Sequence, residues 1–213
     1  LFLYQDRYFI RVNGENDTLF YFFDYDVRTE DKNMQFQHFH TFYELCVMMG
    51  PNTRHILEGK PYDMDTFDII GIPPNVLHRS QYPPGDPCKR LIIQFNLPRN
   101  VTGLSNEYEQ LLGIFHREVP IFRFDAELRK QLFSKINDIF SLSPKTDPMR
   151  DLIIHLKFTE FLTLLFLNQG RNQYTNKSEM TPMEKKIYSV TSYIHAHYFE
   201  DLSLDTLAQK FYI

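Results

Sequence analysis

The chain is poor in the residues that several common kinds of chemistry require. It has only 2 cysteines, Cys46 and Cys88, which stand far apart and form no Cys-x-x-Cys pair. Two isolated thiols are too few for a disulfide framework, so we expect a reducing, cytoplasmic compartment. With only 8 glycines the sequence contains no Gly-rich phosphate-binding loop, and it has no Gly-x-Ser-x-Gly motif. Nothing in it predicts a nucleotide-binding loop or a serine nucleophile.

Basic charge and long apolar runs are also missing. The 27 acidic residues outnumber the 23 basic ones, giving a net charge of −4, which is not the surface expected of a stretch that mainly binds a phosphate backbone. The richest apolar stretch, Phe161 to Leu167, is interrupted by Thr163 and is far shorter than the roughly 20 residues of a membrane span. The first residues lack a basic n-region and a cleavage site, so we expect neither a signal peptide nor membrane association.

Large aromatic residues are abundant, although tryptophan is absent. The chain has 20 Phe and 13 Tyr, and 43% of its residues are hydrophobic, which predicts a globular core built largely of flat side chains.

The first half reads as a series of short strands separated by turn residues. The expected strands are Tyr8–Val12, Leu19–Tyr25, Phe42–Met48, Thr53–Leu57, Phe67–Ile72, Leu77–Gln81 and Leu91–Phe95. The expected turns are Asn13-Gly14, Gly50-Pro51-Asn52, Glu58 to Pro61, Pro73-Pro74-Asn75 and Pro83-Pro84-Gly85. This spacing is typical of a small all-β barrel or sandwich.

After Pro98 the apolar period changes from two to about 3.6, which predicts helices. Asp125 can cap one helix, and Asp147-Pro148 can open another that runs to about Leu167. The second helix has two apolar stripes, so it is either enclosed within one chain or shared with a second copy. We predict a homodimer through these stripes, with contacts from Ile153, Ile154, Leu156, Phe158, Phe161, Leu162 and Leu165.

A polar segment, residues 170–180, lacks helical periodicity and reads as a linker. Thr181-Pro182-Met183-Glu184 then forms a capping box with proline at the first helical position, and Ser203 can cap a further short helix. We therefore predict a barrel over 1–98, a helical region over 99–169, the linker over 170–180 and a last unit over 181–213.

One cluster of residues could carry chemistry. His38, His40 and Glu44 share the parity of one strand face, and His78 could join them from a neighbouring strand. Three imidazoles and a carboxylate suit Fe, Mn, Ni, Cu or Zn. The same side chains could instead hydrogen-bond one another inside an aromatic pocket, so a metal site and a metal-free pocket both stay open.

Several stretches together resemble a known family. His38-Phe39-His40 through Gly50, Gly59 to Tyr62, Asp68 through Arg79, and Leu91 to Phe95 resemble the cupin sensor domain of AraC/XylS-type bacterial transcription regulators. Ser192 through Phe211 resembles the opening of that family's helix-turn-helix DNA-binding domain. One departure is Phe67-Asp68, which stands where the family usually has Gly-Asp at a tight hairpin, and a bulky residue disfavours the positive φ of that turn.

The resemblance implies an α+β protein: an N-terminal cupin-type β-barrel, a helical dimerisation region and the first helices of a truncated helix-turn-helix domain. It implies an effector-sensing role and no enzymatic activity. A sugar, an organic acid or an aromatic compound would bind in the barrel and modulate how two DNA-binding domains are presented. The recognition helix would follow Ile213, so we expect operator binding only by the full-length protein.

The resemblance also shifts the site prediction towards effector contacts, from His38, His40, Glu44 and His78, with Phe42, Tyr43 and Phe95 as walls or core. No cofactor is then expected, although a divalent transition metal on His38, His40, Glu44 and His78 stays open. The alternative function is a metal-dependent cupin enzyme, a dioxygenase or an isomerase.

Overall fold

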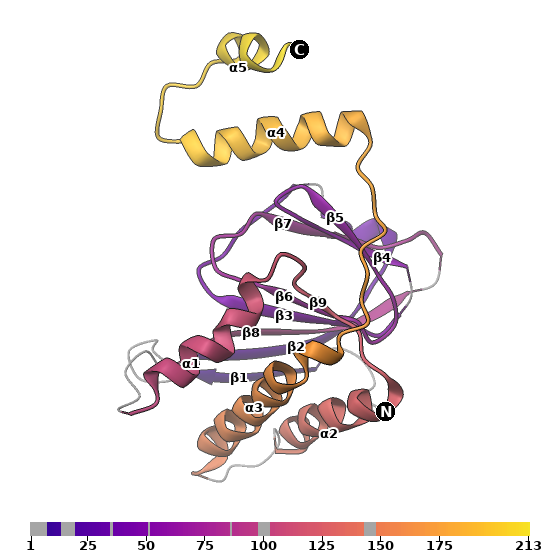
Figure 1. Cartoon of the computed structure of the whole chain (residues 1–213), viewed down its shortest axis with the longest axis vertical. Coiled ribbons are helices and arrows are strands. Elements are labelled where there is room, and N and C mark those ends of the chain that lie inside the picture. The colour runs from indigo at the N-terminus through magenta and orange to yellow at the C-terminus, as the bar shows by residue number, and fades with distance from the viewer. Residues whose placement is uncertain are drawn as a thin grey trace.

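The computed structural model describes residues 8–13, 20–34, 36–50, 52–85, 87–97, 103–142 and 148–213. The features predicted at Gly14, Pro51, Pro98 and Asp147 lie outside these residues. Figure 1 shows two layers of strands in the middle of the molecule, with helices at both ends. No helix in the described ranges is long and apolar enough to cross a membrane.

The strands of the described residues form two antiparallel sheets. The larger sheet has the order β1 (Tyr8–Asn13), β2 (Phe20–Arg28), β8 (Cys88–Asn96), β3 (Tyr43–Met48), β6 (Ile69–Ile72) and β9 (Ile121–Phe122). The smaller sheet has the order β5 (Lys60–Met64), β4 (Thr53–Leu57) and β7 (His78–Gln81). Side chains of both sheets meet in one apolar cluster, among them Met48 and Ile70 from the larger sheet and Leu57 and Met64 from the smaller.

Successive side chains along each strand of the larger sheet point to opposite faces of the sheet. On β3, Leu45 and Val47 belong to the core under the helices, whereas Cys46 and Met48 point between the two sheets. β8 pairs with β3 and follows the same rule, because its odd positions face the helices and its even positions face the barrel interior. Two separate cores therefore lie on either side of one sheet.

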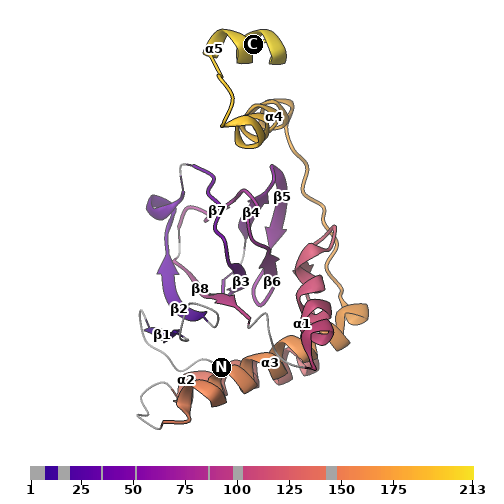
Figure 2. The ribbon, with the colours of Figure 1, turned by 90° about the vertical axis from the view of Figure 1, so that its left-hand side faces the viewer.

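Three helices cover the outer face of the larger sheet (Figure 2). They are α1 (Ser105–Leu112), α2 (Ala126–Leu142) and α3 (Arg150–Leu167). Short 3-10 turns lie at Glu30–Lys32, Gly113–His116 and Gln169–Arg171. The predicted cap of α2 is confirmed, because the Asp125 carboxylate accepts a hydrogen bond from the Leu128 amide at 2.9 Å. Since β9 joins the sheet from between α1 and α2, residues 103–142 complete the barrel domain.

The dimerisation prediction for α3 needs a correction. Ile154, Phe158, Phe161, Leu162 and Leu165 are fully buried in the core between α3 and the sheet of the same chain. They are not available to a second copy, since the aromatic residues of β2 and β8 already pack against them. Leu156 is 57% exposed and Ile153 is partly buried, so only the other stripe faces outward.

The turn at Phe67 forms despite its bulky residue. Phe67 has a φ of 73°, and its amide donates to the carbonyl of Met48 at 2.7 Å. Its ring packs against Phe133 at 5.3 Å between centroids, with the Arg129 guanidinium 4.6 Å from the centroid. These contacts offset the strain of a left-handed conformation, so the turn forms although its bulky residue disfavours a positive φ.

Residues 170–180, which were predicted to be a linker, are held against the barrel by hydrogen bonds. Tyr174 donates to the Asp63 carbonyl at 3.0 Å, and Asn176 donates to the Pro61 carbonyl at 3.1 Å. The Asp63 amide in turn donates to the Ser178 hydroxyl at 2.8 Å. The segment is thus fixed along β5 and leads to α4 (Pro182–His197) and α5 (Leu204–Phe211), which lie beyond the smaller sheet (Figure 1).

Both helices begin at the residues that the sequence indicates. Thr181 and Glu184 form the capping box, and the Ser203 hydroxyl accepts from the Thr206 amide. The ring of Tyr188 on α4 lies directly against Gly59, where an added Cβ would stand 1.8 Å from it. Glycine is therefore required at this turn for α4 to rest on the barrel.

Candidate effector-binding site

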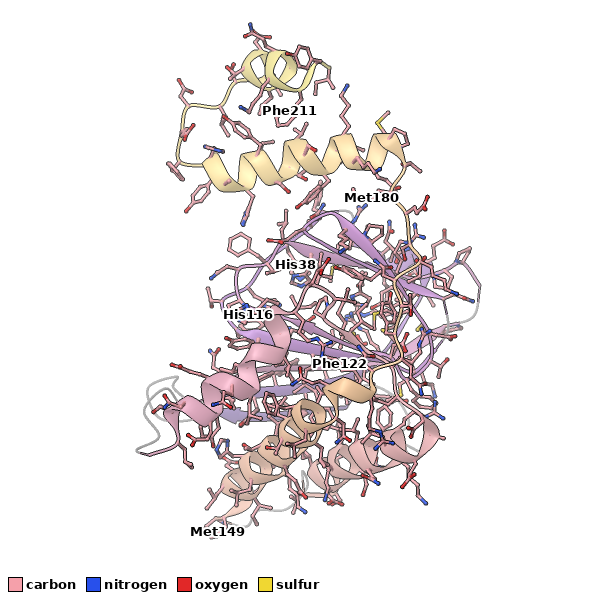
Figure 3. All side chains as sticks on the ribbon, in the orientation of Figure 1. His38, His116, Phe122, Met149, Met180 and Phe211 are labelled. Carbon is pink, nitrogen blue, oxygen red and sulfur yellow. The ribbon has the colours of Figure 1, made fainter. Side chains whose placement is uncertain are left out.

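A small polar cavity of about 210 Å³ lies between the two sheets. Its wall combines inward-facing residues of both sheets with the segment before β3. The lining residues are Phe22, Asp24, Arg28, Met34, His38, Glu44, His55, His78, Ser80, Arg90, Ile92 and Gln94. In Figure 3 the labelled His38 lies at the end of the barrel that faces α4.

The predicted histidines are brought together by backbone pairing. His38 and His78 exchange two backbone hydrogen bonds, of 2.9 and 2.8 Å, in an isolated bridge. Their rings lie 4.2 Å apart between centroids, and the ring of His40 lies 4.8 Å from that of His78. His38 and His78 therefore share one wall of the cavity, and His40 packs beside them without lining it.

Local hydrogen bonds orient the rings of His40 and His78. The Nδ1 atom of each is 2.8 Å from a carbonyl two residues away, that of Phe42 or of Val76. Because a carbonyl only accepts, Nδ1 of each ring donates this hydrogen bond, and in the neutral imidazole Nε2 keeps its lone pair. Both Nε2 atoms are buried without a hydrogen-bond partner among the described residues. The Nε2 atoms of both rings thus face the site, that of His40 within 3.5 Å of a Glu44 carboxylate oxygen.

Glu44 supplies the negative charge of the cluster and is only 5% exposed. Its Oε2 accepts from Gln94 at 2.9 Å and lies 3.5 Å from Nε2 of His40. Burial acts to raise the pKa of Glu44, but the interactions with His40, His78 and Gln94 outweigh it and lower the pKa to about 2. His40, Glu44 and His78 each offer one atom that could bind a metal ion, and these three atoms lie within 4.8 Å of one another. His38, the fourth predicted metal residue, is outside this trio.

Positive charge reaches the cavity from Arg90. Its Nε donates to Asp26 at 2.9 Å and its Nη1 to the Tyr82 hydroxyl at 2.8 Å, with 4% of the side chain exposed. Arg28 pairs with the same Asp26 at 2.8 Å, yet its Nε is buried without a hydrogen-bond partner in the described part of the chain. The cavity therefore presents fixed donors as well as acceptors.

His55 on β4 is buried beside this cluster, with neither ring nitrogen hydrogen-bonded to a described residue. Burial lowers the pKa of His55 to about 3, below its ordinary value of 6.5, because a charged imidazole is poorly solvated there. The imidazole stays neutral in the folded chain at neutral pH.

This burial predicts a specific loss of stability in acid. Below pH 6.5 the unfolded chain protonates His55, whereas the folded chain does not until pH approaches 3. The contribution of neutral His55 to the free energy of unfolding is complete above pH 6.5 and falls by about 1.4 kcal/mol per pH unit below it. We expect His55→Leu to flatten this slope between pH 6 and 4, measured by urea unfolding. His116→Leu, at an exposed position, should leave it unchanged, and equal slopes in both variants would contradict the assignment.

Of the aromatic residues predicted as walls or core, Tyr43 and Phe95 belong to the core and do not line the cavity. Tyr43 and Phe95 pair across β3 and β8, and their rings stack at 5.6 Å in the core under the helices. They differ by one position from Glu44 and Gln94, so they point to the opposite face of the sheet. Phe42 does not line the cavity, but it stacks on the ring of His40 at 4.2 Å and holds it in place.

The sequence interpretation also missed polar residues of the site, namely His55, Arg90, Gln94 and Arg28. Arg90 and Gln94 share the parity of Ile92 within the expected strand Leu91–Phe95 and its flank. A charged and an amide side chain at alternate positions of an otherwise apolar strand were the signal that could have identified them.

The model of the AraC-like ligand binding domain family matches residues 20–143, which is more than half of the chain. The chain belongs to this family. The AraC-like domain accordingly has the predicted α+β fold, a cupin-type barrel of two antiparallel sheets followed by helices. No curated protein matches the chain.

Several solved structures resemble the AraC-like domain at low identity. The AraC-like transcriptional activator CuxR is 11% identical, and the match covers 95% of this chain and 69% of that chain with a TM-score of 0.44. A cupin protein from Bacteroides fragilis is 14% identical and covers 45% of this chain and 81% of its own, with a TM-score of 0.36. An RmlC-like cupin family protein with a double-stranded β-helix fold from Methanocaldococcus jannaschii is 16% identical and covers 47% and 90%, with a TM-score of 0.34.

Proposed function

We propose that the chain is the effector-sensing and dimerisation part of an AraC-type DNA-binding transcription regulator. A small molecule in the barrel would modulate how the DNA-binding domains are presented to an operator. The observation that carries the proposal is the cavity between the sheets, with its oriented and unengaged polar atoms, in a chain of the AraC-like ligand-binding family.

The size and lining of the cavity favour a small polar effector. A volume of about 210 Å³ corresponds to about seven water molecules at roughly 30 Å³ each, and it is smaller than most drug-sized sites. The wall offers a carboxylate from Glu44, an amide from Gln94 and a guanidinium from Arg90. Donors and acceptors side by side suit a molecule with several hydroxyl groups, such as a sugar or a small hydroxy acid, better than a large aromatic compound.

The path to the DNA-binding part would run through the wall that carries His38. This wall faces α4, and α4 and α5 are the helices that resemble the start of the helix-turn-helix domain. A ligand that fixes the bridge between His38 and His78 would favour one arrangement of this wall over another.

For the dimer we propose the outward stripe of α3. Met149, Leu152 and Leu156 are 51%, 48% and 57% exposed, and their spacing of three and four residues places them on one helical face. An exposed apolar stripe of this kind is typical of an interface between copies of a chain. Of the residues predicted from the sequence, Ile153 and Leu156 stay in this proposal.

A second candidate is a metal-assisted pocket on His40, Glu44 and His78. The fit is supported by the two Nε2 lone pairs and the carboxylate, which converge within 4.8 Å, and by carbonyls that hold the Nδ1 atoms. A bound divalent transition metal would supply a Lewis-acidic position for an effector oxygen. The same donor set is what an enzyme of the dioxygenase or isomerase type would use, so turnover by the metal-loaded protein would favour that alternative.

Thermal melting of the purified chain tests the proposal. We expect one member of a panel of sugars and small hydroxy acids to raise the melting temperature by about 5–10 °C at 100 times its Kd, from a stabilisation of about 2.7 kcal/mol. Glu44→Gln should weaken this ligand at least about tenfold, since it loses a charge-assisted hydrogen bond, whereas the exposed Glu109→Gln should not. Adding Mn²⁺ or Zn²⁺ separates the two candidates, because only a metal-assisted pocket needs the ion. A ligand that binds Glu44→Gln unchanged would place the site elsewhere.

A further inference from the structure

A second hollow lies on the outside of the barrel, between the wall that carries His38 and the helix α4. Its volume is about 540 Å³, within the range of small-molecule sites. Phe36, Phe39 and Leu77 form one side, and Ile187 and Ile194 on α4, with Tyr198 directly after it, form the other. It shares no lining residue with the cavity between the sheets. We call it the helix–barrel groove.

The groove exposes an unusual amount of aromatic surface. Phe36 is 81%, Phe39 51% and Tyr198 76% exposed, and all three gather on this one surface. The ring of Phe39 meets the ring of His195 edge-on at 4.9 Å, so contact between the barrel and α4 already exists at one end. Large apolar side chains left open to water in a concave site mark a place where an apolar body binds.

Two buried polar atoms accompany these rings. Arg79 and Gln37 line the groove, and Nε of Arg79 and Oε1 of Gln37 are buried with no hydrogen-bond partner among the described residues. Glu184 attracts Arg79 at longer range, but the hydrogen bonds of its carboxylate go to Thr181. A buried guanidinium N–H without an acceptor is costly, and a carboxylate is the group that satisfies it best.

We propose that the helix–barrel groove binds an aromatic monocarboxylate. The flat ring lies among Phe39, Ile194 and Tyr198, where ring-to-ring contacts are favourable, and the carboxylate accepts from Arg79. Gln37 provides an acceptor that suits a hydroxyl group on the ligand.

Successive side chains of β7 face the inner cavity and the groove in turn, so the two hollows lie on opposite sides of this strand. His78 and Ser80 line the cavity between the sheets, whereas Leu77 and Arg79 line the groove. In the same way His38 lines the cavity, whereas its neighbours Gln37 and Phe39 line the groove. A ligand in the groove contacts both the barrel and α4, so it stabilises their docked arrangement and supplies an input separate from the inner site.

The absence of tryptophan makes a direct test possible. Tyr198→Trp places a single indole in the groove, and Phe199→Trp places one at the neighbouring, 74% exposed position that does not line it. We expect benzoate to change the emission of Tyr198→Trp in a saturable way and to leave Phe199→Trp unchanged. Benzyl alcohol, which lacks the charge, should bind at least about tenfold more weakly.

Charge variants then locate the site. Arg79→Gln in the Tyr198→Trp background should weaken benzoate at least about tenfold, whereas Arg54→Gln, on the adjacent strand and outside the groove, should not. Glu44→Gln should also leave benzoate binding intact, so this result and the test of the inner pocket can fail independently. Calorimetric titration of the unmodified chain repeats the measurement without a reporter.

Three results would overturn the proposal. The first is no saturable response of either the Tyr198→Trp variant or the unmodified chain. The second is equal affinity for benzoate and benzyl alcohol, or an affinity that depends on Glu44 rather than on Arg79. The third is self-association that Ile194→Asp abolishes, which would show that a second copy of the chain covers the groove.

Discussion

Asp26→Asn is expected to lower the free energy of unfolding by about 3–5 kcal/mol. Arg90 is 4% exposed, and its charge is balanced at 2.9 Å by the Asp26 carboxylate, which also pairs with Arg28 at 2.8 Å. An arginine guanidinium does not release its proton at neutral pH, so Arg90 stays charged when the carboxylate is lost. The variant would leave a buried cation with the Tyr82 hydroxyl and a second guanidinium nearby.

The matched control is Asp63→Asn. Asp63 pairs with Arg54 at a shorter distance, 2.6 Å, but the two side chains are 52% and 36% exposed. A pair so open to water contributes no more than about 1 kcal/mol. Urea unfolding of both variants gives the comparison. Equal losses would show that burial of the pair at Arg90 does not govern its energetics.

Phe158→Ala is the second substitution with a large expected effect, again about 3–5 kcal/mol of lost stability. Phe158 is fully buried, and its ring lies 4.7 Å from that of Phe95 and 5.1 Å from that of Tyr21 between centroids. Removing it leaves a cavity between α3 and the sheet, because neighbouring rings can fill the space only in part. Phe199→Ala, at a 74% exposed position, should change stability by less than about 0.5 kcal/mol.

The same variant tests the corrected role of the inner stripe of α3. If Phe158 packs within its own chain, Phe158→Ala lowers the unfolding midpoint by the same amount at every protein concentration. The midpoints of the variant and of the unmodified chain then change with concentration in the same way. A midpoint that recovers as the protein is concentrated would instead place Phe158 at an interface between copies.

Local rules predicted much of the fold. The period of two located most strands, and the caps at Asp125, Thr181 and Ser203 marked helix starts that the structure confirms. β5 was read as part of a turn, because Glu58, Gly59 and Pro61 are turn formers. The turn is in fact the pair Glu58 and Gly59, at φ values of 44° and 71°, and Pro61 lies on an edge strand where its missing N–H is tolerated. β9 was missed because its two residues acquire strand structure only by pairing with β6.

Part of the site was also predictable from the alternation of side chains along a strand. His38, His40, Glu44 and His78 were found because their spacing shows on one or two strands. Tyr43 and Phe95 stayed open between wall and core because the aromatic character of a residue does not say which face of the sheet it enters. Two apolar cores, one on each side of the larger sheet, cannot be told apart by composition.

The sequence by itself determined the alternating strands, the helix caps, the imidazole and carboxylate set and the resemblance to AraC-type regulators. These depend on spacing along the chain, where hydrogen-bonding and hydrophobic periods are set by neighbouring residues. Only the tertiary structure decided that the inner stripe of α3 is buried, that Arg90 and His55 join the histidines, and that α4 forms a groove with the barrel. Each of these depends on which distant segments meet, and no local pattern in the chain encodes the distance between them.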